Sequence, residues 1–202
     1  MNIKIFNNDL PSDIDLSNEK VVALDNEALG LVLGRDPLTL VQIGLASNQC
    51  FLIKLNRDNY EAPNLKKFLS NSNTQFIMHY ARQDLLWIKY HLKVEINNIF
   101  CTKLASKIAR TASNYHGYKD LVKELCGKDI SKKEQQSDWG NPNLSTKQIN
   151  YAANDVLYCV TRSTLLIFIV EPLMFNGSTR APPLISDFAN NHVTSSLVVS
   201  LR

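Results

Sequence analysis

Apolar runs separated by short polar stretches mark the first part of this 202-residue chain. Three of these runs have the length of a buried strand: residues 20–27, 39–46 and 49–55. Because only the turn-like pair Ser47-Asn48 separates the last two, we expect an antiparallel meander. Two shorter apolar runs, at 76–78 and 100–101, predict two further strands.

The rest of the chain has the spacing of apolar residues that is typical of helices. We expect helices at residues 63–69, from about Arg82 onward, and at 103–111, 117–126 and 145–165. Ser145, with Gln148 three residues later, forms a capping box that begins the last of these helices. Strands first, then strands alternating with helices, predict an α/β fold with a mixed five-stranded sheet flanked by helices.

At this length we expect one domain, residues 1–170, and an appended tail. The tail, residues 171–202, is rich in Pro, Ser and Asn and could be partly disordered.

Four carboxylates in three separate segments carry most of the chemical information. Asp25 and Glu27 end an apolar strand, Asp84 lies near the start of a predicted helix, and Asp155 lies in the last one. Burying such charges is costly unless something positive pairs with them. A cluster of carboxylates without Lys or Arg among them suits hard cations such as Mg²⁺ or Mn²⁺.

The spacings within these segments favour one shared site. Asp25 and Glu27 lie two residues apart on a strand and therefore point to one face. Tyr151 and Asp155 lie four apart in a helix and also share a face. Two divalent metal ions roughly 3.5–4 Å apart could stabilise the attacking and leaving oxygens of a phosphodiester, and Tyr151 could orient the attacking water. The candidate catalytic set is therefore Asp25, Glu27, Asp84, Tyr151 and Asp155, of which the four acids are the candidate metal ligands.

These segments resemble the three exonuclease motifs of the DEDD superfamily of 3′-to-5′ exonucleases. Tyr151, four residues before the last acid, resembles the tyrosine subclass, typified by ribonuclease D. The resemblance extends to residues 25–31, Gly34-Arg35-Asp36 and Leu40-Val41-Gln42. Asp9-Leu10-Pro11, residues 102–107, residues 129–132 and the block Gln135-Gln136-Ser137-Asp138-Trp139-Gly140 resemble the short nano-RNase C type. The resemblance to this family covers about residues 3–165. The tyrosine motif together with the Ser-Asp-Trp-Gly block is a specific signal for the family.

Several positions depart from the family pattern. Asn26 stands where Thr is usual, Gln83 where an aromatic residue is common, and Pro37 where a basic residue is frequent. After about Thr164 an apolar run, residues 165–170, and the tail replace the charged amphipathic helix of the family. This last departure concerns terminal packing and assembly rather than the acids.

The resemblance implies the ribonuclease H-like fold, with the acids on one side of the central sheet. It implies a metal-dependent 3′-5′ exoribonuclease that degrades short single-stranded RNA, down to dinucleotides, to nucleoside 5′-monophosphates. Asp25, Glu27 and Asp155 would hold one metal, and Asp25 with Asp84 the second. A DNA-directed or dual-specificity exonuclease and a catalytically silent nucleic-acid-binding relative remain alternatives. The family precedent also implies a ring-shaped homo-oligomer, such as an octamer.

Five residues are candidates for binding the substrate: Leu29, His79, Arg82, Lys103 and Trp139. By the family resemblance Leu29 could wedge against the terminal base, or it could pack in the core. His79 could hold a phosphate or the acids, or be a satisfied strand-end histidine. Arg82 and Lys103, like His116 and Lys132, could contact phosphates or be solvated. Trp139 could stack on a base or fill a core edge.

Composition sets the remaining expectations. The net charge of +3 is weak evidence for a polyanionic partner and suits a small nucleotide. The cysteines are too widely separated for a structural zinc site, and this favours thiols in a reducing, cytoplasmic location. We expect no membrane partner, because the N-terminus lacks the pattern of a signal peptide and residues 165–170 are too few to span a bilayer.

Overall fold

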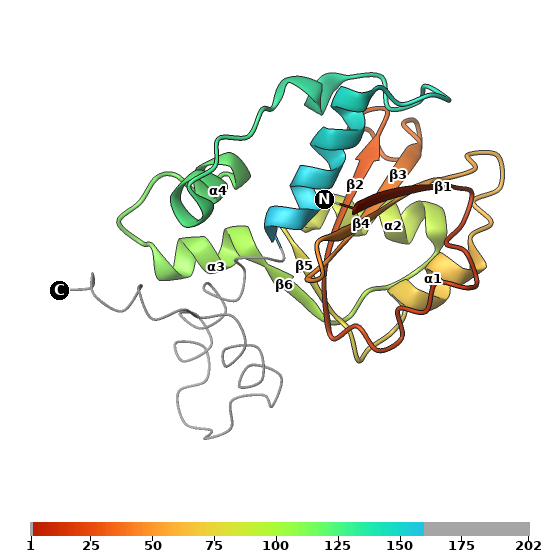
Figure 1. The fold of residues 1–202 in the computed structure, drawn as a ribbon, viewed down its shortest axis with the longest axis horizontal. Coiled ribbons are helices and arrows are strands. Elements are labelled where there is room, and N and C mark those ends of the chain that lie inside the picture. Colours follow the sequence, from red (N-terminus) through yellow and green to blue (C-terminus); the bar gives the residue numbers. More distant parts are fainter. Residues whose placement is uncertain (1, 160–202) are drawn as a thin grey trace.

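A six-stranded mixed sheet lies at the centre of the molecule (Figure 1), a computed structural model that describes residues 2–159. The strands are β1 (Asn2–Asn7), β2 (Val21–Ala28), β3 (Leu38–Leu45), β4 (Gln49–Lys54), β5 (Gln75–Met78) and β6 (Ile99–Cys101). Their order in the sheet is β1-β4-β3-β2-β5-β6. The predicted antiparallel meander is confirmed as β2, β3 and β4, while β1, β5 and β6 each pair in parallel with a neighbour.

The prediction of five strands was wrong by one, because β1 was missed. This strand pairs only with β4 and forms one edge of the sheet. Ile5 remains 41 % exposed, and Phe6, stacked on Phe51 with ring centroids 6.0 Å apart, is only partly buried. A half-exposed edge strand needs few apolar residues, so its sequence pattern is weak.

The predicted helices are confirmed with small shifts of their ends. They are α1 (Pro63–Leu69), α2 (Arg82–Leu92), α3 (Thr102–Ala109), α4 (Tyr118–Cys126) and a helix at residues 146–159; the 3-10 helix η1 (Lys133–Gln136) was not predicted. The capping box is present: Ser145 N–H donates to Gln148 Oε1 at 2.9 Å, and Gln148 N–H donates to Ser145 Oγ at 3.2 Å. The rest of the predicted helix to residue 165 and the predicted tail at 171–202 lie outside the described residues. Among residues 2–159, no helix has the length and apolarity needed to cross a membrane.

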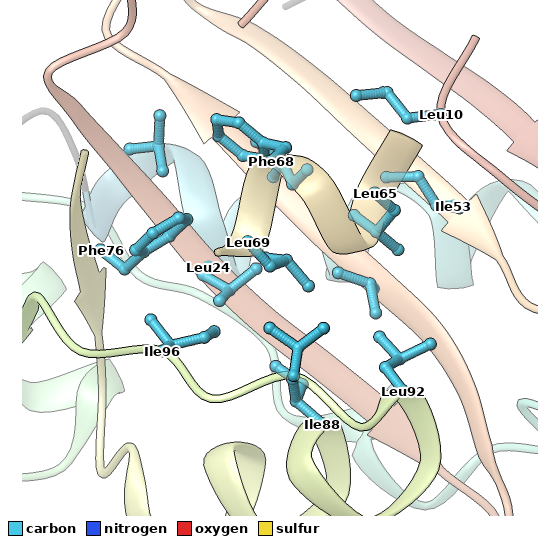
Figure 2. Packing of buried hydrophobic residues seen from close by; sticks show 14 of the residues in the cluster. Leu10, Leu24, Ile53, Leu65, Phe68, Leu69, Phe76, Ile88, Leu92 and Ile96 are labelled. Atoms are coloured by element: carbon cyan, nitrogen blue, oxygen red, sulfur yellow. The ribbon is translucent and has the colours of Figure 1, made fainter. Parts of the chain in front are cut away.

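Helices α1 and α2 cover one face of the sheet with large side chains. Leu65, Phe68 and Leu69 of α1 and Ile88 and Leu92 of α2 point toward the strands in Figure 2 and belong to one buried cluster. Pro63 stands at the start of α1, where a missing N–H costs nothing. This continuous apolar layer supplies most of the hydrophobic burial of the domain.

The helix of residues 146–159 packs very closely on the opposite face. A Cβ added to Gly44 of β3 would lie 2.9 Å from Val156 Cβ and 3.0 Å from the Val156 carbonyl, so only glycine allows this approach. Ala152 and Ala153 are also fully buried here, in one cluster with Ala23 of β2. In Figure 1 this helix, drawn in cyan to blue, lies beside β2. Small residues on both sides thus bring the helix down onto the strand that carries the first two acids.

Candidate active site

Three carboxylates from two elements meet where the close helix crosses β2. Asp25 and Glu27 follow Ala23 on one face of β2, and Asp155 follows Ala152 and Ala153 on the helix. One oxygen from each of Asp25, Glu27 and Asp155 lies within 4.8 Å of the other two. That spacing is short enough for a single cation to be bound by all three. The structure thus brings together the three acids that the sequence predicts as one metal site.

The fourth acid, Asp84, belongs to α2, which covers the opposite face of the sheet from the helix that carries Asp155. It occupies the first turn of α2, which begins just after β5, the parallel neighbour of β2. Its carboxyl group shares a hydrogen bond with Asp25, and such a bond requires one proton between the two groups. Asp25 therefore lies next to Glu27 and Asp155 on one side and to Asp84 on the other, as a residue that bridges two cations would.

Burial raises the pKa values of all four acids, and repulsion from neighbouring acids adds to this at Glu27, Asp84 and Asp155. Burial raises the pKa of Asp25 to about 6. The pKa of Glu27 lies well above its usual range because of burial first and then repulsion from Asp25, Asp155 and Asp84. Burial and the nearby Asp25 raise the pKa of Asp84 and of Asp155 in the same way. Without a positive charge the site favours bound protons, and a divalent cation would favour the ionised carboxylates.

Tyr151 stands beside Asp155, as the four-residue spacing predicts. Its hydroxyl donates a hydrogen bond to the Asp155 carboxylate, and this bond lowers the pKa of that acid. Burial, followed by the charges of Asp155 and Glu27, raises the pKa of Tyr151 far above the value of a free phenol. In the metal-free site Tyr151 therefore keeps its proton and acts as a hydrogen-bond donor to Asp155.

A cleft of about 890 Å³ opens over these five residues. One wall is the segment from Leu24 to Leu31, and another is the stretch from Ile130 to Trp139, which includes η1. The start of α2 and the residues before it close a third side. This volume lies within the range of small-molecule sites in proteins.

Residues 7–164 match the model of a family described as 3′-5′ exonuclease. The chain belongs to this family. Among its relatives, ribonuclease D of Desulfotalea psychrophila is 33% identical over 152 residues, which is 75% of this chain and 40% of that one. DNA polymerase I of Aquifex aeolicus is 32% identical over 143 residues, 70% of this chain and 23% of that one. The chain thus spans less than half the length of these curated relatives.

Solved structures support the same assignment. The Brucella melitensis nuclease NrnC, bound to pGG, is 37% identical and superimposes with a TM-score of 0.80 over 86% of this chain and 84% of that one. The same nuclease with bound Mg²⁺ superimposes with a TM-score of 0.79 at 36% identity. The fold is therefore the ribonuclease H-like exonuclease fold, as predicted, with six strands in place of five.

Leu29 lies at the rim of the cleft and is 41 % exposed. Of the two roles that the sequence allowed for Leu29, packing in the core is therefore excluded. A Cβ on Gly140 would lie 3.0 and 3.1 Å from the two Leu29 methyl carbons, so a larger residue at 140 would crowd the Leu29 side chain. Lys54 and Arg57 hold the Gly140 segment by donating to the carbonyl oxygens of residues 140–142. The Ser-Asp-Trp-Gly block therefore supports Leu29 at the cleft.

His79 lines the cleft as a neutral side chain. Burial, then repulsion from Lys103 and Lys132, lowers the pKa of His79 to about 4. Thr102 Oγ1 donates to the Met78 carbonyl at 3.3 Å, so His79 Nδ1–H donates to Thr102 Oγ1 over 3.0 Å. This geometry favours the satisfied strand-end histidine over a cationic phosphate ligand.

The basic candidates separate into two groups. Lys103 lines the cleft, and its Nζ lies 3.8 Å from the centroid of the Tyr80 ring. Lys132 also lines the cleft, and its charge lowers the pKa of Asp155. Arg82 is exposed and His116 is hydrogen-bonded to Ser106, and neither belongs to the cleft lining.

Trp139 is 3 % exposed and packs rather than presenting a free face for stacking. Its ring lies 5.9 Å from the ring of Tyr151, measured between centroids. Of its two predicted roles the structure favours the core edge, where Trp139 holds Tyr151 in place.

One cleft residue, Tyr118, was missed by sequence reasoning. Its hydroxyl donates to the carbonyl of Asn154 at 2.7 Å, directly before Asp155, and its ring lies 5.5 Å from that of His79. It thereby ties α4 to the helix that carries Asp155. No local pattern around Tyr118 indicates this contact, because its partner lies 36 residues away.

Proposed function

We propose that this protein is a metal-dependent 3′-5′ exoribonuclease that degrades short oligoribonucleotides, including dinucleotides, to nucleoside 5′-monophosphates. The observation that carries this proposal is the meeting of Asp25, Glu27 and Asp155 within 4.8 Å, at the floor of a cleft. Family membership supports cleavage in the 3′-to-5′ direction, and the carboxylates of the site could bind the metal ions that such cleavage needs.

The donor set fits two divalent cations of the hard class, Mg²⁺ or Mn²⁺. All four groups are carboxylates and their pKa values are raised. Within residues 2–159 none of the three acids that meet within 4.8 Å forms a salt bridge, although the charge of Lys132 lowers the pKa of Asp155. Asp25, Glu27 and Asp155 would hold one ion, and Asp25 with Asp84 the other. When bound, the ions supply charge stabilisation to the attacking and leaving oxygens of an in-line displacement. The Mg²⁺ bound by NrnC supports this assignment.

Tyr151 orients the attacking water. Its protonated hydroxyl lies beside Asp155 and Glu27, on the side of the site that opens into the cleft. A fixed hydroxyl can hold a water by one hydrogen bond and direct a lone pair of that water at phosphorus. Trp139 limits the positions that the Tyr151 ring can take.

The cleft accounts for a short substrate. Its volume of about 890 Å³ suits a few nucleotides rather than a long strand. Leu29 at the rim can lie against the terminal base, while Lys103 and Lys132 face the phosphates. The pGG ligand of NrnC is a dinucleotide of the expected kind.

A DNA-directed or dual-specificity exonuclease is the second candidate. The similarity to a DNA polymerase I favours it. The acids would act identically on either sugar, and the difference lies in contacts to the 2′-hydroxyl. A catalytically silent binding protein is disfavoured, because all four acids and Tyr151 are present and assembled.

Two further properties belong to the proposal. We propose a homo-oligomer in which neighbouring subunits close the cleft, supported by Leu31 and Val32, which are 81 % and 48 % exposed beside Leu29. We also propose a cytoplasmic location, which suits the separated cysteines. Light scattering on the purified protein and fractionation of cells test these two statements.

The central test uses purified protein with 5′-labelled RNA and DNA, as dinucleotides and as strands of about ten and twenty nucleotides, in Mg²⁺, Mn²⁺ or EDTA. We expect shortening from the 3′ end, release of nucleoside 5′-monophosphates, no reaction in EDTA, and fastest turnover on short RNA. Equal rates on DNA would support the second candidate. Absence of cleavage in both metals would overturn the enzymatic proposal.

A further inference from the structure

Gln42 is a fully buried polar residue in the middle of an apolar strand. It is 0 % exposed, and its neighbours in β3, Val41 and Ile43, are 0 % exposed as well. A buried amide without a good partner destabilises a protein relative to an apolar residue of the same shape. A glutamine at this position therefore needs a reason other than packing.

The register of the sheet places Gln42 on the face of the acids. Its Cα pairs with Asp25 on β2 and with Leu52 on β4. Residues opposite one another in a sheet share a face, and Glu27 lies two residues beyond Asp25 on that face. The Gln42 side chain therefore extends beneath the three-acid group.

Within residues 2–159, neither amide atom of Gln42 reaches a partner at ordinary hydrogen-bond geometry. The polar group that its side chain interacts with is the Glu27 carboxylate, and this interaction opposes the rise of the Glu27 pKa. The Glu27 carboxylate is thus the acceptor within reach of the Gln42 amide, which has no other hydrogen-bond partner among residues 2–159.

We propose that Gln42 is a positioning residue that orients the Glu27 carboxylate for metal binding. With a cation bound, Gln42 Nε2 would donate to one Glu27 oxygen and leave the other oxygen free for the cation. Hydrogen bonds to a ligating carboxylate fix its orientation, and their removal typically lowers metal affinity by about 10–100-fold. This inference rests on the proposed metal-dependent function.

The test measures Mn²⁺ binding by the free protein, without substrate. Gln42→Met keeps a similar length and volume but removes the donor. Thermal unfolding is followed over a MnCl₂ titration for wild type, Gln42→Met and the control Leu52→Met. Leu52 is also 0 % exposed and stands beside Gln42 in the register, so its variant changes the same layer without an amide.

We expect Gln42→Met to bind Mn²⁺ at least about tenfold more weakly, with a metal-free melting temperature equal to or above that of wild type. Leu52→Met should retain wild-type affinity. Excess Mn²⁺ should restore kcat in Gln42→Met, since a positioning defect is overcome by mass action.

Several results would overturn the inference. Unchanged Mn²⁺ affinity in Gln42→Met, beside a wild type that binds, removes the Gln42 role and leaves the proposed function standing. A lower melting temperature with unchanged affinity shows a packing role only. If wild type itself shows no Mn²⁺-dependent stabilisation, both proposals fail. Should Gln42→Met not fold, Gln42→Leu takes its place, and failure of both beside a folded Leu52→Met assigns Gln42 to the core.

Discussion

The two faces of the central sheet differ in the size of their side chains. Toward α1 and α2 the strands present large residues such as Leu24, Ile43 and Phe76, all nearly or fully buried. Toward the helix of residues 146–159 they present Ala23 and Gly44 at the level where that helix crosses. The second face also carries large buried residues, Leu40, Leu52 and Ile77, so the two faces differ at the helix crossing and in the acids beyond it.

The two faces of the sheet therefore have different roles: one contributes mainly to stability, and the other carries the candidate catalytic residues. Large side chains on the α1/α2 face contribute hydrophobic burial, at about 25 cal/mol per Å² of apolar surface. Small side chains on the acid face give up part of that burial, but they let two backbones approach until Asp155 meets Asp25 and Glu27. The acids then repel one another, so this face costs stability until a cation binds. The following predictions test that separation.

The largest effect is expected from removing an acid. Asp25→Ala or Asp155→Ala should lower cleavage at least about a thousandfold, since a bound cation supplies several kcal/mol of charge stabilisation and 1.36 kcal/mol is a factor of ten in rate. The metal-free melting temperature should stay the same or rise, because one of the repelling charges is gone. Single-turnover rates at saturating Mg²⁺ or Mn²⁺ measure the first effect, and near-wild-type rates would contradict the assignment.

The opposite result is expected on the other face. Leu65→Ala in α1 empties a fully buried position, and it should lower the free energy of unfolding by about 2–5 kcal/mol in a urea titration. The kcat of the folded fraction should remain close to wild type. A large loss of kcat below the unfolding transition would show that the two faces are not independent.

Tyr151→Phe tests a residue that belongs to the chemistry alone. Removing the hydroxyl should lower kcat by about a hundredfold with little change in KM, because a group that acts in the transition state affects kcat. The Trp139 contact keeps the ring in place. A matching rise in KM at constant kcat would instead make Tyr151 a residue that holds the substrate.

The stability of the metal-free protein should depend on pH through the acid face. Because burial raises the pKa of Asp25 to about 6 from 3.8, the folded state holds more protons than the unfolded state between these values. The contribution of Asp25 to stability should therefore be fully present below about pH 3.8 and should be lost, by on the order of 3 kcal/mol, as pH rises through about 6. Mn²⁺ should stabilise more as pH rises. Chemical unfolding at several pH values measures this slope, and Asp25→Asn, which cannot titrate, should flatten it; an unchanged slope in that variant would contradict the assignment.

Leu29 should give the smallest effect, confined to one class of substrate. Leu29→Ala removes an exposed rim side chain whose burial against a base contributes on the order of 1.5–3 kcal/mol. Dinucleotides should bind more than about tenfold more weakly, and longer strands, which have more phosphate contacts, should lose less. Equal losses for both lengths in a binding titration would exclude a role in selecting the chain end.

Much of the fold could be predicted from local pattern. The apolar runs that became β2, β3 and β4, the capping box at Ser145 and the spacing of Tyr151 from Asp155 all depend on residues close together in the chain. The acids could be named for the same reason, because each motif is complete within a few residues. Backbone periodicity and capping are local interactions, so residues near one another in the chain are enough to predict them.

Other features depend on contacts between segments that are distant in the sequence. The edge strand β1 is stabilised by pairing with β4 rather than by its own pattern. The need for glycine at position 44 follows from the close approach of Val156, which lies far away in the sequence. The hydrogen-bond partner of Tyr118 is the carbonyl of Asn154 on another helix. Gln42 looks like an interruption of an apolar strand until the register places it under the acids. Burial and repulsion act through space between segments distant in sequence, so the raised pKa values and the charge requirement of the site arise only once the chain has folded.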